Sequence, residues 1–127
     1  MTNIKIFFAV IILLIFGAVI TVLLRSSKTS APGKYDAFTT CLKDKNATFY
    51  GAFWCTHCQA QKRLFGSSAK LLPYIECSTA DGAGQLPICK DKDITGYPTW
   101  EFADGSRLSG EVSLEQLAEK TSCELPK

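Results

Sequence analysis

The sequence has little net charge and little of the patterning that nucleic-acid binding requires. Its 127 residues carry a formal charge of +2, and no basic run alternates with aromatic residues. It has neither an internal repeat nor a low-complexity tract. With 46% hydrophobic residues and moderate charge, the composition excludes a disordered chain and gives no reason to expect a nucleic-acid partner. The length suits one domain of ordinary size.

Charged side chains are missing from residues 6–24. A helix over these residues would be roughly 28 Å long, close to the hydrocarbon core of a bilayer. We therefore expect residues 1–24 to form an uncleaved transmembrane anchor. A cleaved signal peptide is the alternative, but its apolar region is usually shorter, and the candidate cleavage site at residues 29–31 is followed by Pro32.

The polar residues 25–34 are expected to form a flexible linker to one domain at residues 35–127. The numbers of basic residues before and after the apolar run are nearly equal. The slight excess after the run disfavours export of the C-terminus. Six cysteines in so short a chain favour an oxidising compartment. We therefore predict a single-span membrane protein whose soluble domain lies outside the cytoplasm, in the periplasm or its equivalent.

Hydrophobic spacing and turn residues predict alternating helices and strands in the soluble part. A capping box at residues 113–116 opens the last helix, and Gly66 is a plausible end for the second. The predicted helices cover residues 36–45, 54–65, 86–92 and 113–121, and the predicted strands 47–53, 72–77, 99–102 and 107–112, with a loop at 78–85 and a hairpin turn at 103–106. This order indicates an α/β fold with helices on both faces of a mixed sheet.

The candidate chemistry lies at Cys55 and Cys58, where a predicted buried strand gives way to a helix. Cysteines three positions apart at a helix start can close a small disulfide. The positive end of the helix dipole and its unpaired amides favour a thiolate at Cys55, which is the nucleophilic form. Cys58, one turn inside, can attack a mixed disulfide at Cys55 and release the partner. We predict that Cys55 attacks and Cys58 resolves.

Other roles for this pair are weaker. A zinc site with Cys77 and Cys89 would need two close-spaced couples, but eleven residues separate the second couple. A purely structural disulfide would remove little chain entropy, and haem attachment would need histidine where Gln59 stands. His57, the only histidine, lies inside the motif and would stabilise a Cys55 thiolate when protonated. The alternative is a surface histidine without a role.

A second motif is Gly96-Tyr97-Pro98-Thr99, at the start of a predicted strand. A proline there fits a cis peptide bond in a tight turn, although an ordinary turn proline fits as well.

These two motifs resemble those of the thioredoxin family, over about residues 35–123. More narrowly, residues 49–55, 72–77 and 96–100 resemble the thioredoxin-like domain fused to bacterial vitamin K epoxide reductase homologues. The resemblance implies that Pro98 is cis, lies against the active-site disulfide and helps to bind substrate backbone. With Pro98, we expect Trp54, Thr56 and Tyr97 to contact the substrate. The resemblance also implies a partner that exchanges electrons with a reductase through a quinone.

The chain departs from these families in three ways. It holds one candidate span and no multi-span reductase domain, so a separate vitamin K epoxide reductase homologue would have to reoxidise it. Ordinary thioredoxins carry a buried acid six residues before the first active cysteine, where this chain has Phe49. The Thr56-His57 pair between the cysteines is closer to the Pro-His pair of periplasmic oxidases than to the Gly-Pro pair of thioredoxins.

The other four cysteines allow several pairings, because six cysteines can pair in fifteen ways. We favour Cys77 with Cys89 and Cys41 with Cys123, both structural. The second would join the two ends of the domain, a stabilisation of about 3–4 kcal/mol from restricting the unfolded chain. In the sharper alternative, Cys77 and Cys89 relay electrons.

The leading functional hypothesis is a thiol–disulfide oxidoreductase that oxidises cysteine-containing secreted proteins. One alternative reverses the electron flow, as in a reductant for cytochrome c maturation or an isomerase; another is a non-catalytic module that binds unfolded chains. We expect no metal and no cofactor beyond the Cys55–Cys58 disulfide, with quinone used only through the partner. The expected partners are secreted thiol proteins, the reductase homologue and the lipid bilayer.

Overall fold

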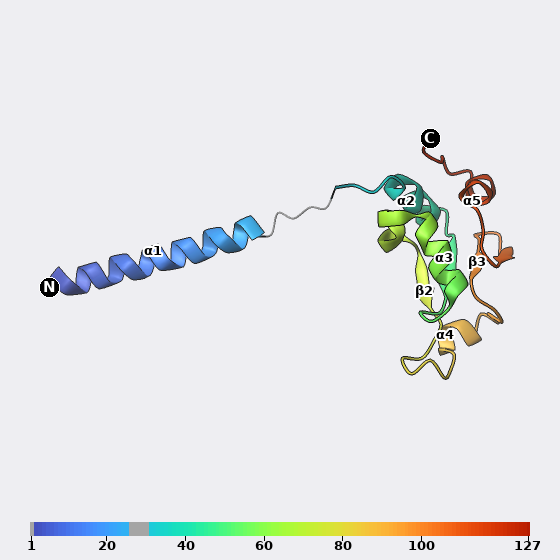
Figure 1. Cartoon of the computed structure of the whole chain (residues 1–127), viewed down its shortest axis with the longest axis horizontal. Coiled ribbons are helices and arrows are strands. Elements are labelled where there is room, and N and C mark those ends of the chain that lie inside the picture. The colour runs from blue at the N-terminus through green and yellow to red at the C-terminus, as the bar shows by residue number, and fades with distance from the viewer. Residues whose placement is uncertain (1, 26–30) are drawn as a thin grey trace. The chain divides into compact units, whose positions relative to one another are not determined.

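The structure, a computed structural model, describes residues 2–25 and 31–127 (Figure 1). They fall into two compact units, one ending at Ala31 and one spanning Pro32–Lys127. Each unit is described by itself below.

The first unit is the helix α1, Thr2–Arg25. Its segment Asn3–Val22 is long and apolar enough to cross a membrane, and its large apolar side chains are exposed. This is compatible with the predicted single span, although a signal sequence near an N-terminus has the same features.

Part of the predicted linker at residues 25–34 falls on residues 26–30, which lie outside the described residues. The last residues of that range already contact the folded unit. The Gly33 amide donates a hydrogen bond of 2.8 Å to the Asp36 carboxylate, and a Cβ on Gly33 would clash with Ser68 Oγ. The close approach explains why a glycine stands there.

The second unit is built on a four-stranded mixed sheet in the order β2-β1-β3-β4. Its central pair holds Phe49 opposite Trp100, antiparallel, while β2 runs parallel to β1 on the other side. β4 closes the sheet as the antiparallel partner of β3. The strands are β1 Thr48–Gly51, β2 Tyr74–Glu76, β3 Thr99–Glu101 and β4 Arg107–Ser109.

One face of the sheet carries the main core. Phe49 and Trp100 are fully buried there and stack with their ring centroids 5.0 Å apart. Phe38 and Leu117 belong to the same cluster and come from the first and last helices of this unit. The helical elements are α2 Asp36–Asp44, α3 Thr56–Leu64, the 3-10 helix η1 Gly66–Leu71, α4 Pro87–Lys90 and α5 Leu114–Thr121.

The opposite face carries a smaller core around Tyr50. Successive strand residues point to opposite faces, so Tyr50 turns away from the Phe49 side. It packs with Ile94 and with Cys77 and Cys89, the last of which lies on α4. Helices therefore pack against both faces of a mixed sheet, which confirms the predicted α/β, thioredoxin-like fold.

Several boundaries differ from prediction. The last strand ends at Ser109 and not at residue 112, because Gly110 has a φ of +86° and the Val112 amide bonds to Gln61 Oε1 at 2.7 Å. The helix α3 starts at Thr56, since Cys55 has extended backbone angles and caps it. The capping box at Ser113 is present as predicted.

Candidate active site

Cys55 and Cys58 stand where β1 turns into α3, and both are free thiols in this structure. A turn after β1 closes when the Cys55 amide donates to the Ala52 carbonyl, at 3.0 Å. Cys55 is the N-cap residue of α3, and its sulfur accepts a hydrogen bond from the Cys58 amide at 3.4 Å. The first thiol therefore lies at the N-terminal end of α3, against an amide that has no partner within the helix.

The second thiol has the opposite environment. Cys58 is fully buried, whereas Cys55 keeps 8% of its surface exposed. Burial above all, with a hydrogen bond to Cys55 added, raises the pKa of the Cys58 thiol to about 12. The Ala52 backbone and the charge of Lys62 act in the opposite direction but do not outweigh burial. At neutral pH, Cys58 therefore holds its proton.

The predicted proline lies beside the dithiol. The Tyr97–Pro98 peptide bond is cis, and the Cys55 thiol donates to the Tyr97 carbonyl at 3.6 Å. The buried Thr99 hydroxyl donates to the Gly96 carbonyl at 2.8 Å and ties the segment together. The two motifs found in the sequence, more than thirty residues apart, therefore meet at Cys55.

Exposed aromatic side chains flank the dithiol. Trp54 is 53% exposed, and its ring meets the half-buried Tyr97 ring edge-on with centroids 6.0 Å apart. Phe53 is 48% exposed, and Thr56 is exposed on the first turn of α3. Trp54, Thr56 and Tyr97, which were predicted to contact substrate together with Pro98, thus lie around Cys55. Their contact with a substrate stays a prediction.

His57 points toward a different residue than the sequence predicted. Its Nδ1 lies 2.8 Å from Glu111 Oε1, in the segment after β4, and 70% of its side chain is exposed. The contact ties α3 to that segment at the surface, where an ion pair contributes little. The predicted stabilisation of the Cys55 thiolate by His57 stays a prediction.

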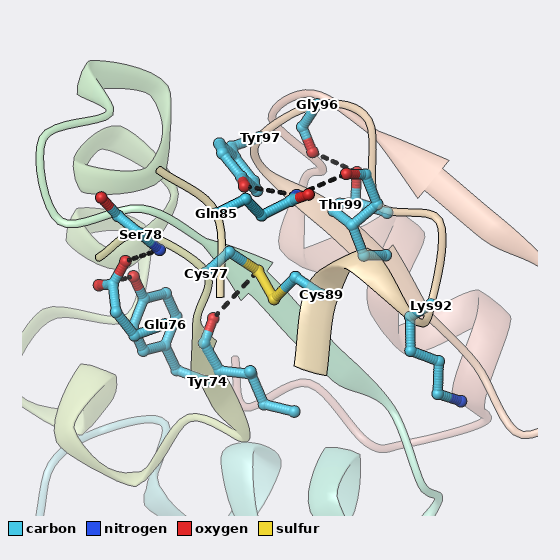
Figure 2. Close-up of a disulfide and its surroundings, with 12 residues drawn as sticks. Tyr74, Glu76, Cys77, Ser78, Gln85, Cys89, Lys92, Gly96, Tyr97 and Thr99 are labelled. Carbon is cyan, nitrogen blue, oxygen red and sulfur yellow. Dashed lines mark hydrogen bonds between the residues drawn. A yellow bond between two sulfur atoms is a disulfide. The ribbon is translucent and has the colours of Figure 1, made fainter. Parts of the chain in front are cut away.

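The other four cysteines form two disulfides, Cys41–Cys123 and Cys77–Cys89, the pairs favoured from the sequence. Figure 2 shows the second one beside Glu76, Gln85 and Tyr97.

The loop between Cys77 and Cys89 reaches the aromatic residues of the site. Ser78 Oγ accepts a hydrogen bond of 2.8 Å from Trp54 Nε1. Gln85 Nε2 donates one of 2.7 Å to the Tyr97 hydroxyl, as Figure 2 shows. A Cβ on Gly82 would lie 3.6 Å from Trp54 Cδ1, so the loop tip lies against the indole. Sequence reasoning did not single out Ser78 or Gln85, because these contacts exist only after the loop folds back.

Tyr74 and Glu76 are further neighbours of the dithiol, and no role was predicted for them from the sequence. The Tyr74 hydroxyl donates to Glu76 Oε2 at 2.7 Å. Glu76 Oε1 accepts from the amides of Ser78, at 2.8 Å, and Phe53, at 3.2 Å. Tyr74 and Glu76 are two positions apart, so a predicted strand places them on the same face. That spacing does not reveal which residues of β1 lie beside them.

The fold and the site together define a class. A four-stranded mixed sheet, a dithiol at the start of α3 and a cis proline beside it are consistent with a thioredoxin-like protein. Comparison with known proteins supports the same class. Over 88 residues the chain is 46% identical to thiol-disulfide oxidoreductase LTO1 of Arabidopsis thaliana, a match that covers 66% of this chain and 23% of that protein.

A second relative is protein disulfide isomerase-like 5-1 of Oryza sativa subsp. japonica, 28% identical over 102 residues, which are 72% of this chain and 69% of the relative. No protein-family model matches the chain. The names of both relatives support a thioredoxin-like family and an oxidoreductase or isomerase role. The chain spans less than a quarter of the first relative's length.

Proposed function

We propose that the chain is a membrane-anchored thiol–disulfide oxidoreductase that oxidises the thiols of secreted proteins through Cys55 and Cys58. The observation that carries the proposal is the inequality of the two thiols: Cys55 caps α3 and keeps 8% of its surface exposed, whereas Cys58, one turn inside the helix, is fully buried. An attacking sulfur at the helix start with a resolving sulfur one turn inside is the arrangement that disulfide exchange requires.

In the oxidising direction, a substrate thiolate attacks Cys55 Sγ of the Cys55–Cys58 disulfide and forms a mixed disulfide. The bond to Cys58 breaks, and Cys58 takes up a proton. A second substrate thiolate then attacks the substrate sulfur of the mixed disulfide and releases Cys55 as a thiolate. The substrate leaves with one new disulfide, and the chain leaves as the dithiol.

Substrate backbone would lie along residues 96–98. Tyr97 and Trp54 provide an aromatic surface next to Cys55, and apolar contact with an unfolded segment suits a protein that acts on newly exported chains. We propose that Thr56 and Pro98 complete this surface.

A dithiol peptide and the oxidised full chain in detergent micelles provide the test. Wild type should form the peptide disulfide, and Cys55→Ser should be inactive. Cys58→Ser is given the disulfide form of the peptide instead: its Cys55 thiolate should attack that disulfide, release one peptide thiolate and remain trapped as a mixed disulfide. A Cys41→Ser/Cys123→Ser variant controls for the loss of two cysteines away from the site and should keep its activity. Full function in Cys55→Ser would instead favour the non-catalytic binding module.

The direction of electron flow follows from the redox potential of the pair. A stabilised Cys55 thiolate favours the reduced form and makes the disulfide oxidising. A potential near or below about −270 mV, the value of thioredoxin, would contradict an oxidase. The name of the rice relative favours the second candidate, an isomerase, and activity confined to the dithiol form on a scrambled substrate would support it.

The proposed location is the non-cytoplasmic side of a membrane, with α1 as the anchor. Two structural disulfides support an oxidising compartment. Thiol labelling in intact cells with a membrane-impermeant maleimide should reach Cys55 in the Cys58→Ser variant, and labelling only after lysis would contradict this location.

The proposed electron acceptor is a membrane reductase homologous to vitamin K epoxide reductase, which would pass electrons to a quinone. Reoxidation of the reduced chain should then require both that reductase and quinone in proteoliposomes. Equal reoxidation without quinone would contradict this partner.

A further inference from the structure

Cys58 has to lose its proton whenever it attacks a mixed disulfide at Cys55, because only a thiolate attacks. Its sulfur is fully buried, and burial raises the pKa of this thiol to about 12. Free hydroxide is scarce at neutral pH, so a nearby group that takes the proton would speed the step. Phe49 lies on β1, the strand that leads into the dithiol, and its side chain has no group that could take this proton.

Tyr74 is a polar side chain near this buried sulfur, and Lys62 is a second one. A Cβ built on Gly51 would lie 3.0 Å from Cys58 Sγ, 2.8 Å from Tyr74 Cε2 and 3.4 Å from the Tyr74 hydroxyl oxygen. The sulfur and the phenol therefore pack around one point of the β1 backbone, which stays open because residue 51 is glycine. The parallel register fixes this approach, since Tyr74 lies beside Phe49 and Glu76 beside Gly51.

The environment of Tyr74 keeps its hydroxyl neutral. Burial is the largest cause of a strongly raised pKa at Tyr74, followed by the hydrogen bond and charge of Glu76, and then by the charges of Cys58 and Cys55. Lys62 Nζ lies 3.4 Å from the centroid of the Tyr74 ring and further fixes its position. A neutral hydroxyl that both accepts and donates can pass a proton onward without holding charge.

Glu76 is the group that can receive that proton. Its Oε2 accepts from the Tyr74 hydroxyl at 2.7 Å, as Figure 2 shows. Amides of Ser78 and Phe53 hold the other oxygen, so the carboxylate has a fixed orientation. The side chain is only partly buried, and it can therefore exchange protons with solvent.

We propose that Tyr74 is a further catalytic residue of this chain, which carries the proton of Cys58 to and from the carboxylate of Glu76. The inference rests on the proposed function and adds the proton path that it lacks. Glu76 acts through Tyr74 and orients its hydroxyl.

The step balances in both directions. When Cys58 attacks, its S–H bond breaks, the proton moves to the Tyr74 oxygen, and the Tyr74 proton moves to Glu76 Oε2. The Cys55–Cys58 bond forms, and the partner leaves as a thiolate. When a substrate thiolate opens the Cys55–Cys58 disulfide instead, Cys58 receives a proton from Tyr74, which is restored from Glu76.

Dithiodipyridine separates the two thiols kinetically. With the full chain in detergent and the Cys55–Cys58 pair reduced, Cys55 attacks the reagent and releases one thiopyridone, and Cys58 then resolves the mixed disulfide and releases a second. Tyr74→Phe keeps the ring and removes only the hydroxyl. It should leave the first release unchanged and slow the second at least about tenfold at pH 7, the lower end of what general acid–base catalysis contributes.

The pH profile distinguishes proton transfer from packing. In Tyr74→Phe the second release should rise about tenfold per pH unit up to pH 10, because only bulk base remains, while wild type should vary less. Glu76→Gln should behave like Tyr74→Phe, since its amide can keep the Ser78 contact but takes no proton. Tyr50→Phe is the matched control: it removes a buried hydroxyl beside Glu101, on the other face of β1, and should change neither release.

Two results would overturn the proposal. One is a second release in Tyr74→Phe with the wild-type rate and pH profile. The other is equal slowing of both releases without a change in pH profile, which would indicate disturbed packing. If wild type releases no first thiopyridone, the failure lies earlier, in the proposed function itself.

Discussion

At the scale of single residues, the two thiols differ because one helical turn separates an N-cap position from a core position. Cys55 meets the free amide of Cys58 and the carbonyl of Tyr97. Cys58 belongs to the main core cluster, next to the Gly51 backbone. Spacing along one helix start therefore places one thiol at the N-cap and the other in the core, although both belong to the same residue type.

The first prediction concerns alkylation of these thiols. In the reduced protein at pH 7, iodoacetamide should modify Cys55 in the Cys58→Ser variant far faster than Cys58 in the Cys55→Ser variant. Burial, the largest cause of the raised Cys58 pKa, persists in the latter, so its alkylation rate should keep rising with pH beyond 9. Mass spectrometry of timed samples measures both rates. Equal rates at pH 7 would contradict the assignment of Cys55 as the attacking thiol.

Sequence reasoning reaches Cys55, Cys58 and Pro98 because each is part of a short motif with its own physical signature. It cannot reach Tyr74 and Glu76 in the same way. Their significance depends on the parallel pairing of β2 with β1, which is a tertiary contact. The same holds for the contact between His57, on α3, and Glu111, in the segment after β4.

At the scale of elements, the Cys77–Cys89 disulfide fixes a loop that forms one side of the site. It anchors the loop to the Tyr50 face of the sheet, with Ile94 in the same cluster. From there the loop supports both aromatic residues beside Cys55, through Ser78 at Trp54 and Gln85 at Tyr97. The disulfide is therefore placed to order the surface that we propose for substrate binding.

The second prediction follows from this support. A Cys77→Ser/Cys89→Ser variant should raise KM for a dithiol peptide several-fold, because Trp54 and Tyr97 lose their ordered support, while iodoacetamide should still modify Cys55 at the wild-type rate. The fluorescence of exposed Trp54 should change, whereas fully buried Trp100 should not contribute to the change. Loss of electron transfer with an unchanged KM would instead support the relay role of this disulfide.

Most elements of the second unit, Pro32–Lys127, could be predicted from hydrophobic spacing and turn chemistry, as the capping box at Ser113 illustrates. The 3-10 helix η1 could not. Its sequence begins with Gly66, Ser67 and Ser68, which is typical of a loop. Its order depends on distant contacts, since buried Ser68 accepts a hydrogen bond of 3.0 Å from the Tyr35 amide.

At the scale of the whole molecule, Cys41–Cys123 joins α2 to the segment after α5, across a sequence separation of 82 residues. The Cys77–Cys89 bond closes a separation of only 12. A disulfide restricts the unfolded chain more when it closes a longer loop. The two disulfides therefore have different expected roles. Cys41–Cys123, which closes the longer loop, should stabilise the fold, and Cys77–Cys89 should order the site.

The third prediction tests this division. A Cys41→Ser/Cys123→Ser variant should lose about 2–5 kcal/mol of unfolding free energy, and a Cys77→Ser/Cys89→Ser variant should lose less. Denaturant unfolding of the full chain in detergent, followed by far-ultraviolet circular dichroism of the soluble unit's sheet and helices, measures both losses. Below the unfolding midpoint the first variant should retain its KM, because Cys41 lies on α2 and Cys123 follows α5, whereas Cys55 caps α3. If the short disulfide proves the more stabilising of the two, loop-closure entropy is not what these bonds supply, and strain or local packing at α4 would have to replace it.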